Sequence, residues 1–104
     1  MSEKEINIAI AEYRGWQILE PEVHRAFTYH WAIEPDGSKS ILPDCCNDLN
    51  AMREVEMTLS NEIYEEYWNQ LIFVCMNEGE ERMNSASAKL RAKAFVITIG
   101  KWKG

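Results

Sequence analysis

Apolar residues recur at helical spacing in four parts of the chain, which predicts four helices. In the last of them, Ser87 can cap the first turn and Gly100 can end the helix. In the second, the residues outside the apolar stripe, Glu56 among them, are expected to face water. The predicted helices span 2–14, 47–59, 60–76 and 87–100.

Polar and apolar residues alternate between the first two helices, which predicts strands. Over 25–34 the pattern indicates one strand whose aromatic face carries Phe27, Tyr29, Trp31 and Ile33. The turn signal Pro-Asp-Gly over 35–37 predicts that the chain returns as a partner strand over 38–42. The short apolar run over 16–19 is compatible with a further strand, and the polar residues 77–84 are expected to form a loop.

The length of 104 residues fits one α+β domain spanning 1–104, and a hydrophobic content of 46% provides for a core. No run approaches the roughly 18 apolar residues of a membrane span, and the first residues lack the layout of a signal peptide. We therefore expect a cytoplasmic protein without a membrane partner. Cys45, Cys46 and Cys75 are expected to be reduced thiols, and the sparse ligating side chains predict no metal site.

Charge is unevenly distributed along the chain, whose formal net charge is −6. Every Asp and Glu lies at or before Glu81, whereas the segment after Arg82 carries five cations and no acid. The overall acidity argues against duplex nucleic acid as a partner, because phosphate contacts supply most of that affinity. The acid-free segment leaves a local site for an anion open.

The start of the last predicted helix is the first candidate for ligand binding, because helix N-termini attract anions. Lys89 and Arg91 follow Ser87 closely, and a bound phosphate or carboxylate would explain why cations stand against the helix dipole there. The alternative is that both are solvated charges or pair with the acidic helices. Helix periodicity turns Arg91 away from Lys89 and Lys93, toward the apolar side of the domain.

Polar and aromatic residues elsewhere supply the remaining candidates for ligand binding. Asn47 and Asn50 can hydrogen-bond a base or a ribose, although helix capping also explains Asn47. Trp16 and Trp102 lie one and two residues after a helix-ending glycine, where partial exposure would allow a base to stack on the ring. Arg14, two residues before Trp16, adds a further cation.

Catalysis is not predicted from the residue types and their spacing. The sequence has no recognisable Ser-His-acid arrangement and no glycine-rich phosphate loop. His30 shares its strand face with Thr28 and Ala32, which favours a hydrogen-bonded structural histidine over a general base. No cofactor is expected.

Two segments of the sequence carry a family resemblance. They are Leu-Pro-Asp-Cys-Cys-Asn-Asp-Leu-Asn-Ala-Met over 42–52 and Ser-Ala-Lys-Leu-Arg-Ala-Lys-Ala-Phe over 87–95, which continues as Thr-Ile-Gly-Lys-Trp over 98–102. Together with Tyr-Arg-Gly-Trp over 13–16, they resemble the phage ABA-sandwich family of small phage and prophage proteins. The resemblance implies a small antiparallel sheet packed between helices, an α-β-α sandwich. The segment 77–84 is short and polar where family members often carry a further strand.

Thoeris anti-defence proteins are similar in size and look related to this family. They sequester nucleotide immune signals, such as cyclic ADP-ribose isomers, without cleaving them. The resemblance therefore implies a phage-encoded protein that sequesters a cyclic nucleotide or cyclic ADP-ribose-type signal of Thoeris or CBASS defence in the host cytoplasm. The cations, amide and aromatic ring of such a pocket would be Arg91, Lys89, Arg14, Asn50 and Trp16.

Two other functions stay open at this point. A protein-interaction module that inhibits a host enzyme is the first alternative, because the predicted helices over 47–59 and 60–76 are acidic. An enzyme that degrades the signal is the second. Self-association is expected with any bound nucleotide, because two subunits enclose such a ligand more easily than one domain of this size.

Overall fold

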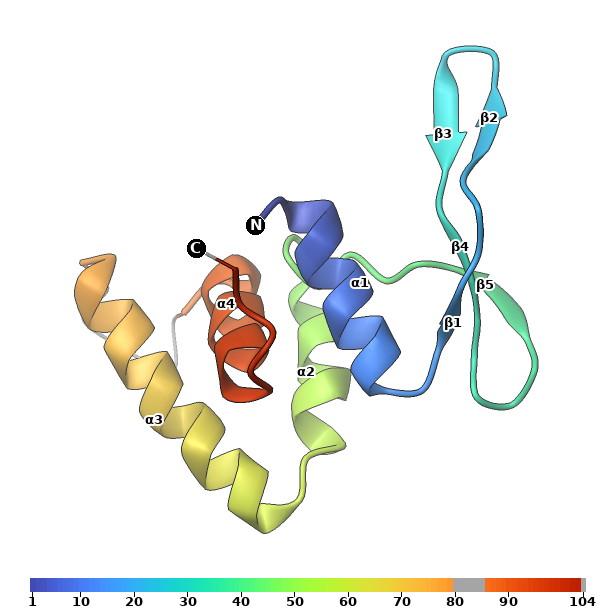
Figure 1. The fold of residues 1–104 in the computed structure, drawn as a ribbon. Coiled ribbons are helices and arrows are strands. Elements are labelled where there is room, and N and C mark those ends of the chain that lie inside the picture. Colours follow the sequence, from blue (N-terminus) through green and yellow to red (C-terminus); the bar gives the residue numbers. More distant parts are fainter. Residues whose placement is uncertain (80–85, 104) are drawn as a thin grey trace.

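The four predicted helices are present in the computed structural model, which describes residues 1–79 and 86–103 (Figure 1). Each helix begins and ends within two residues of its predicted range, so the helical periodicity is confirmed. The first predicted loop residues, 77–79, end the third helix, and residues 80–85 lie outside the described part of the chain. The helices are α1 (Glu3–Tyr13), α2 (Leu49–Met57), α3 (Asn61–Asn77) and α4 (Ala88–Thr98).

Side chains at the starts of α1, α2 and α4 explain where these three helices begin, whereas Ser60 at the start of α3 forms no side-chain capping hydrogen bond. The Ser2 hydroxyl accepts a hydrogen bond from the backbone N–H of Glu5, and the Glu5 carboxylate accepts one from the backbone N–H of Ser2. Asp48 caps α2, and Ser87 caps α4 by accepting from the N–H of Leu90 at 3.2 Å. These caps are local in sequence, which is why the sequence pattern finds them.

The strands form two small antiparallel sheets. One has the order β1-β4-β5, and the other pairs β2 with β3. Their bounds are β1 (Gln17–Ile18), β2 (Glu22–His24), β3 (Phe27–Tyr29), β4 (Trp31–Ile33) and β5 (Lys39–Ile41). The predicted α+β class with antiparallel strands is therefore confirmed.

The single strand predicted over 25–34 is wrong at its start and in its middle, because the structure divides it at His30 into β3 and β4, which belong to different sheets. Arg25 and Ala26 form the two-residue tip of a hairpin, and the chain before them is strand β2, which the sequence pattern did not predict. Arg25 has a φ of 59°, the left-handed conformation that glycine or asparagine usually supplies at such a tip. Because neither residue stands there, the hairpin carries no turn signal in the sequence.

The aromatic face of this strand does not form the core. Phe27 and Tyr29 are exposed, whereas Ala32, on the opposite face, is completely buried. A strand outside the core shows the same alternation as a strand inside it, so periodicity identifies the two faces but not which one is covered.

The core lies between the helices, with α4 in the middle. Helix α4 contacts α3, α1 and α2 (Figure 1). The largest fully buried side chains are Tyr67, Phe95, Ile10, Met52, Leu71 and Val55. The apolar face predicted for α3 is thus confirmed at Tyr67 and Leu71, whereas Glu56, predicted to face water, is buried on α2.

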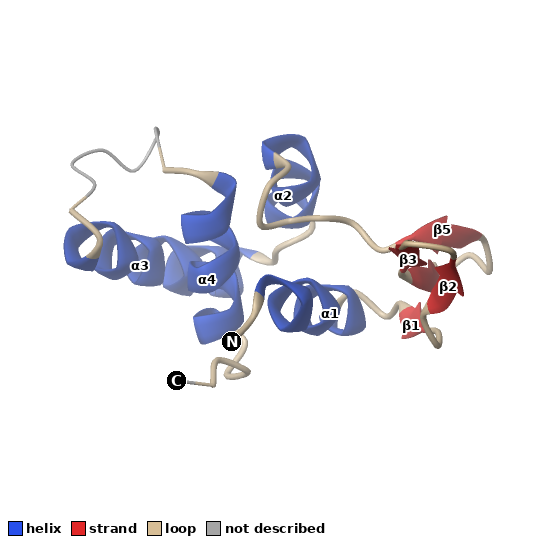
Figure 2. Cartoon of the chain, turned by 90° about the horizontal axis from the view of Figure 1, so that it is seen from above, coloured by secondary structure: helices blue, strands red, loops and turns tan. Residues whose placement is uncertain are grey.

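Figure 2 shows the strands on one side of the helices. Helix α1 contacts β1, and β2 and β3 project beyond it (Figure 1). The sheet therefore lies beside the helices rather than between two helical layers, because strands of two or three residues bury too little area to separate such layers. Among residues 1–79 and 86–103, no helix is long and apolar enough to cross a membrane.

Candidate functional site

Helix α4 divides its cations between the surface and the interior, as its periodicity predicts. Lys89 is exposed and Lys93 half-buried, whereas Arg91 exposes only 6% of its surface. Ser87 is exposed, and its hydroxyl is engaged in the helix cap.

Arg91 binds a carboxylate of the protein itself. One terminal guanidinium nitrogen donates to both oxygens of Glu56, at 2.9 and 3.1 Å, and Nε donates to the carbonyl oxygen of Ala86 at 3.1 Å. The hydroxyl of Tyr67 donates to Glu56 Oε2 at 2.6 Å, and the ring of Trp68 lies 5.9 Å from Arg91 Cζ. The arrangement joins α2, α3 and α4 through a buried ion pair. It explains the direction of Arg91 toward the apolar side without a ligand.

Helix periodicity predicts that Arg91 points toward the apolar side of the domain, and its burial confirms this.

Lys89 and Asn47 meet on a single carboxylate at the start of α1. Lys89 Nζ lies 3.6 Å from Glu3 Oε2, and the amide of Asn47 donates to Glu3 Oε1 at 2.9 Å. The same amide also donates to both oxygens of Asp44, at 3.0 and 3.2 Å. The structure thus brings two of the predicted site residues together, and each of them contacts an acid of the protein.

Arg14 and Trp16 lie at the other end of α1. The guanidinium carbon of Arg14 is 5.5 Å from the centroid of the Trp16 ring, which is half-buried as predicted. Both line a hollow of about 460 Å³, to which Glu34 and Asp36 also contribute. Asn50 is exposed in the first turn of α2, where its backbone N–H donates to Asp48. The predicted site residues are therefore distributed over separate parts of the molecule.

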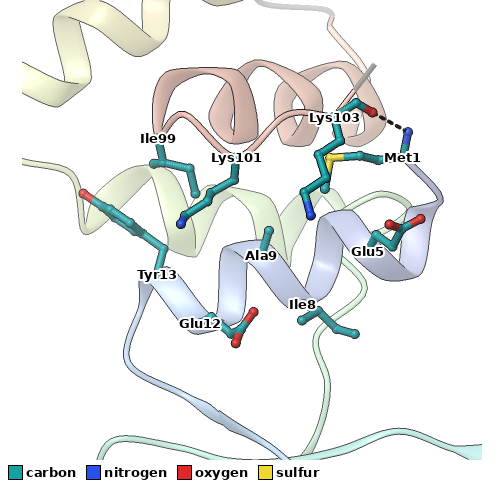
Figure 3. Close-up of a pocket in the computed structure, with 9 residues that line it drawn as sticks. All are labelled: Met1, Glu5, Ile8, Ala9, Glu12, Tyr13, Ile99, Lys101 and Lys103. Carbon is teal, nitrogen blue, oxygen red and sulfur yellow. Dashed lines mark hydrogen bonds between the residues drawn. The ribbon is translucent and has the colours of Figure 1, made fainter.

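A larger hollow lies between α1 and the chain that follows α4, and we call it the α1 groove (Figure 3). Its volume is about 560 Å³, within the roughly 300–1,000 Å³ typical of small-molecule sites. Figure 3 shows Lys101 and Lys103 extending from the C-terminal segment over α1. The groove is lined by Met1, Glu5, Ile8, Ala9, Glu12, Tyr13, Ile99, Lys101 and Lys103.

The side chains of the α1 groove combine two cations with an aromatic ring. Among the described residues, neither Lys101 nor Lys103 forms an ion pair within 4.0 Å of a carboxylate oxygen. Tyr13 exposes 47% of its surface, and its ring packs edge-on against Phe95 at 5.5 Å. The ring is thus held on the core while much of its surface stays open to a ligand.

Two carboxylates also line the α1 groove. Glu5 is engaged in the capping box, and the hydrogen bond from the backbone N–H of Ser2 lowers the pKa of its carboxyl group. Glu12 is exposed near Tyr13 (Figure 3). A carboxylate repels phosphate but accepts hydrogen bonds from ribose hydroxyls, so the groove favours a ligand that carries both groups.

The prediction from sequence missed the groove, although it identified the segment that supplies its cations. Lys101 and Lys103 belong to the acid-free run after Arg82, and their spacing places both on one side of an extended chain. Tyr13 could have been recognised as a candidate because it is the last residue of α1. The sequence alone does not predict that the segment after α4 lies against α1.

The cysteines of the protein are buried thiols. Burial raises the pKa of Cys45 to about 11 and that of Cys46 to about 12, so both are protonated near neutral pH and poorly nucleophilic. Cys75 is buried as well, and all three are free of disulfides. Within the described ranges, no group of three or more His, Cys, Asp and Glu side chains could hold a metal ion.

Comparison with protein-family models, with curated proteins and with solved structures finds no match for this chain.

Proposed function

We propose that this protein binds a small nucleotide in the α1 groove and sequesters it without cleaving it. The observation that carries the proposal is the pair Lys101 and Lys103, which stand over a groove of suitable volume and, among the described residues, form no ion pair within 4.0 Å of a carboxylate oxygen. A ligand phosphate therefore meets these ammonium groups without first breaking an ion pair, although the charge of Lys103 already acts on Glu5 and contributes to the lowered pKa of its carboxyl group. Cations committed to Glu3 or Glu56 would require that displacement.

The other groove residues fit the remaining parts of a nucleotide. The exposed ring of Tyr13 offers a surface on which a base can stack. Glu12 can accept hydrogen bonds from ribose hydroxyls, and Ile8 and Ile99 supply an apolar lining. The proposed contacts are phosphate to the lysines, base to Tyr13 and ribose to Glu12.

Sequestration needs binding groups but no nucleophile. The described thiols and the buried tyrosine hydroxyl lie outside the groove: Cys45 and Cys46 are buried thiols of raised pKa, and the hydroxyl of Tyr67 donates to Glu56 in the core. These positions support binding over catalysis as the role of the groove. The resemblance to phage ABA-sandwich proteins adds the biological proposal, a phage counter-defence protein that captures a cyclic nucleotide or cyclic ADP-ribose-type signal in the host cytoplasm.

Isothermal titration calorimetry tests the proposal with a panel of cyclic dinucleotides, cyclic trinucleotides and cyclic ADP-ribose isomers. The decisive variant is the double substitution Lys101→Ala/Lys103→Ala. Its matched control is Lys89→Ala/Lys93→Ala, which removes the same charge from α4. Loss of charge-assisted hydrogen bonds to phosphate is expected to weaken binding by at least about tenfold in the first variant alone.

The titration tests whether and where the nucleotide binds, and analysis of the nucleotide recovered afterwards tests whether it is cleaved. No heat from any nucleotide with the wild-type protein refutes the proposed function. Equal weakening by both double variants places the ligand outside the α1 groove. Recovery of intact nucleotide after the protein is denatured supports sequestration, and recovery of a product establishes an enzyme instead.

A second candidate function, inhibition of a host enzyme through a protein interface, is favoured by the exposed apolar side chains of α3. Phe73 and Met76 expose 67% and 73% of their surfaces, and Ile72 lies beside them on the helix. A host protein recovered by wild-type bait and lost by a Phe73→Ser/Met76→Ser variant would support this function. A pull-down in which both baits recover the same proteins would exclude it.

A further inference from the structure

The hairpin formed by β2 and β3 projects from the molecule without a covering layer (Figure 1). All six residues of the two strands are exposed, among them Val23 at 70% and Phe27 at 67%. A two-stranded hairpin without a hydrophobic partner is marginally stable in water. We propose that β2 pairs antiparallel with β2 of a second copy of this chain, so that two hairpins form one four-stranded sheet.

The hairpin geometry leaves the outer edge of β2 ready for such pairing. Arg25 and Ala26 form a two-residue loop, and the flanking residues His24 and Phe27 are partners in the ladder. In that geometry the flanking pair exchanges both backbone hydrogen bonds, and the next pair, Val23 and Thr28, directs its N–H and C=O groups outward. Val23 therefore presents a donor and an acceptor on the free edge of β2.

One register of self-pairing satisfies these outward backbone groups and sets no like charges against each other. When the two-fold axis passes beside Val23, each Val23 lies opposite Val23 of the second copy. Glu22 then lies opposite His24 of the second copy, and the symmetry creates this pair twice. Within one chain the Glu22 carboxylate already lies 3.4 Å from His24 Nε2 and 3.3 Å from Lys39 Nζ, so these groups can be shared between the copies. Apolar residues that face each other across strands stabilise a sheet, and a carboxylate opposite an imidazole avoids the repulsion of like charges.

The neighbouring registers are unfavourable. A shift that centres the pairing on Glu22 brings two carboxylates face to face and sets Val23 against Pro21, which has no N–H to donate. A shift that centres it on His24 brings two histidines together and sets Val23 against Arg25, whose φ of 59° takes it out of the strand. Pro21 also stops the edge from pairing further toward β1. The pairing is therefore short and closed by symmetry.

The edge of β3 is less suited to a second copy. The backbone N–H of Leu42 donates to the carbonyl oxygen of His30 at 2.8 Å, so the chain of β5 already occupies this side of the strand next to Thr28. A partner strand along β3 would meet Leu42 and Pro43. Thr28 is exposed and directed outward like Val23, which makes it a matched control position.

Cysteine crosslinking tests the register directly. In the proposed sheet the two Val23 Cα atoms lie at a spacing that a disulfide can bridge, roughly 5.5 Å. A Val23→Cys variant is expected to form a covalent dimer on mild oxidation, and Thr28→Cys is expected to remain monomeric under the same conditions. The native cysteines interfere little, because all three are buried. Equal dimer yields from the two variants would overturn the proposal.

The second test measures the molecular mass in solution of the full chain and of variants in which the charges at positions 22 and 24 are changed. Sedimentation equilibrium of the wild-type protein should show an average mass that rises with concentration toward that of a dimer. His24→Glu places like charges opposite each other twice and should weaken the dimer by about tenfold, whereas Glu22→Lys/His24→Glu should restore it. A wild-type mass that stays that of one chain, or a double variant as weak as the single one, would refute the pairing. Neither test contains a nucleotide, so its result does not depend on the α1 groove.

Discussion

Substitution of Arg91 by Met is expected to destabilise the protein severely, because it leaves the carboxylate of Glu56 buried without its cation. Glu56 exposes 9% of its surface, and the two oxygens lie 2.9 and 3.1 Å from the same Arg91 nitrogen. In the variant, the hydroxyl of Tyr67 is the remaining described hydrogen-bond donor to this carboxylate. One neutral donor does not replace a guanidinium in a site that excludes water.

The size of the effect follows from the burial of both partners. Removing one member of a buried ion pair costs about 3–5 kcal/mol. Domains of this size are stable by about 5–15 kcal/mol in total, so the loss is a large fraction of the free energy of unfolding. At about 4–8 °C for each kcal/mol, even the lower cost of about 3 kcal/mol lowers Tm by roughly 12–24 °C.

The assay is urea unfolding followed by circular dichroism, with the slope of the transition compared between variants. A loss below about 1 kcal/mol for Arg91→Met would refute the reasoning, since an exposed pair loses no more than that. The control is the variant Glu56→Met/Tyr67→Phe/Arg91→Met, which removes all three polar groups. It should recover much of the stability, because no buried charge or hydroxyl is left without a partner.

Three further predictions concern the cap, the thiols and the two aromatic sites. Ser87→Ala removes the side-chain cap of α4 and should lower the unfolding free energy by about 1 kcal/mol in chemical denaturation. Burial raises the pKa of Cys45 to about 11 and of Cys46 to about 12, above the ordinary value of 9.0. The unfolded state therefore loses these protons first, so stability should fall as the pH rises above 9, and Cys45→Ala/Cys46→Ala should flatten that fall. Phe95→Ala in the core should cost about 3–5 kcal/mol, whereas Phe27→Ala on the hairpin should change the unfolding free energy of dilute protein by less than about 0.5 kcal/mol.

The sequence predicted those parts of the fold that depend on neighbours in the chain. Helix α4 is predicted correctly, because its cap and its periodicity depend on residues a few positions apart. It begins after Ser87, and Gly100 follows its end with a φ of 74°. The hairpin tip at Arg25 could not be predicted in this way, because its left-handed backbone is imposed by strand pairing and not by the residue. Local preference determines an element where no stronger tertiary contact opposes it.

A long-range contact explains why the predicted exposure of Glu56 was wrong. Glu56 was expected to face water because its position lies outside the apolar stripe of α2, and Arg91 is 35 residues away in the sequence. Each residue alone looks like a solvated charge or a ligand contact, and only the packing of α2 against α4 makes them partners. The α1 groove is equally invisible to local patterns, because it joins Met1 to Lys103 at the far end of the chain.

In the acid-free segment after Arg82, the ion pairs of the folded protein determine which cations are available to a ligand. Its five cations occupy three environments: Arg91 pairs with Glu56 in the core, Lys89 and Lys93 pair with Glu3 and Glu78 at the surface, and Lys101 and Lys103 line the α1 groove. A phosphate gains little from a cation whose carboxylate partner it must first displace, and it gains most where no such partner stands. Sequence charge therefore locates an excess of positive charge, but the ion pairs of the folded chain determine where an anion binds. If the protein binds a nucleotide as proposed, the ion pairs of the acid-free segment therefore favour the α1 groove over the start of α4.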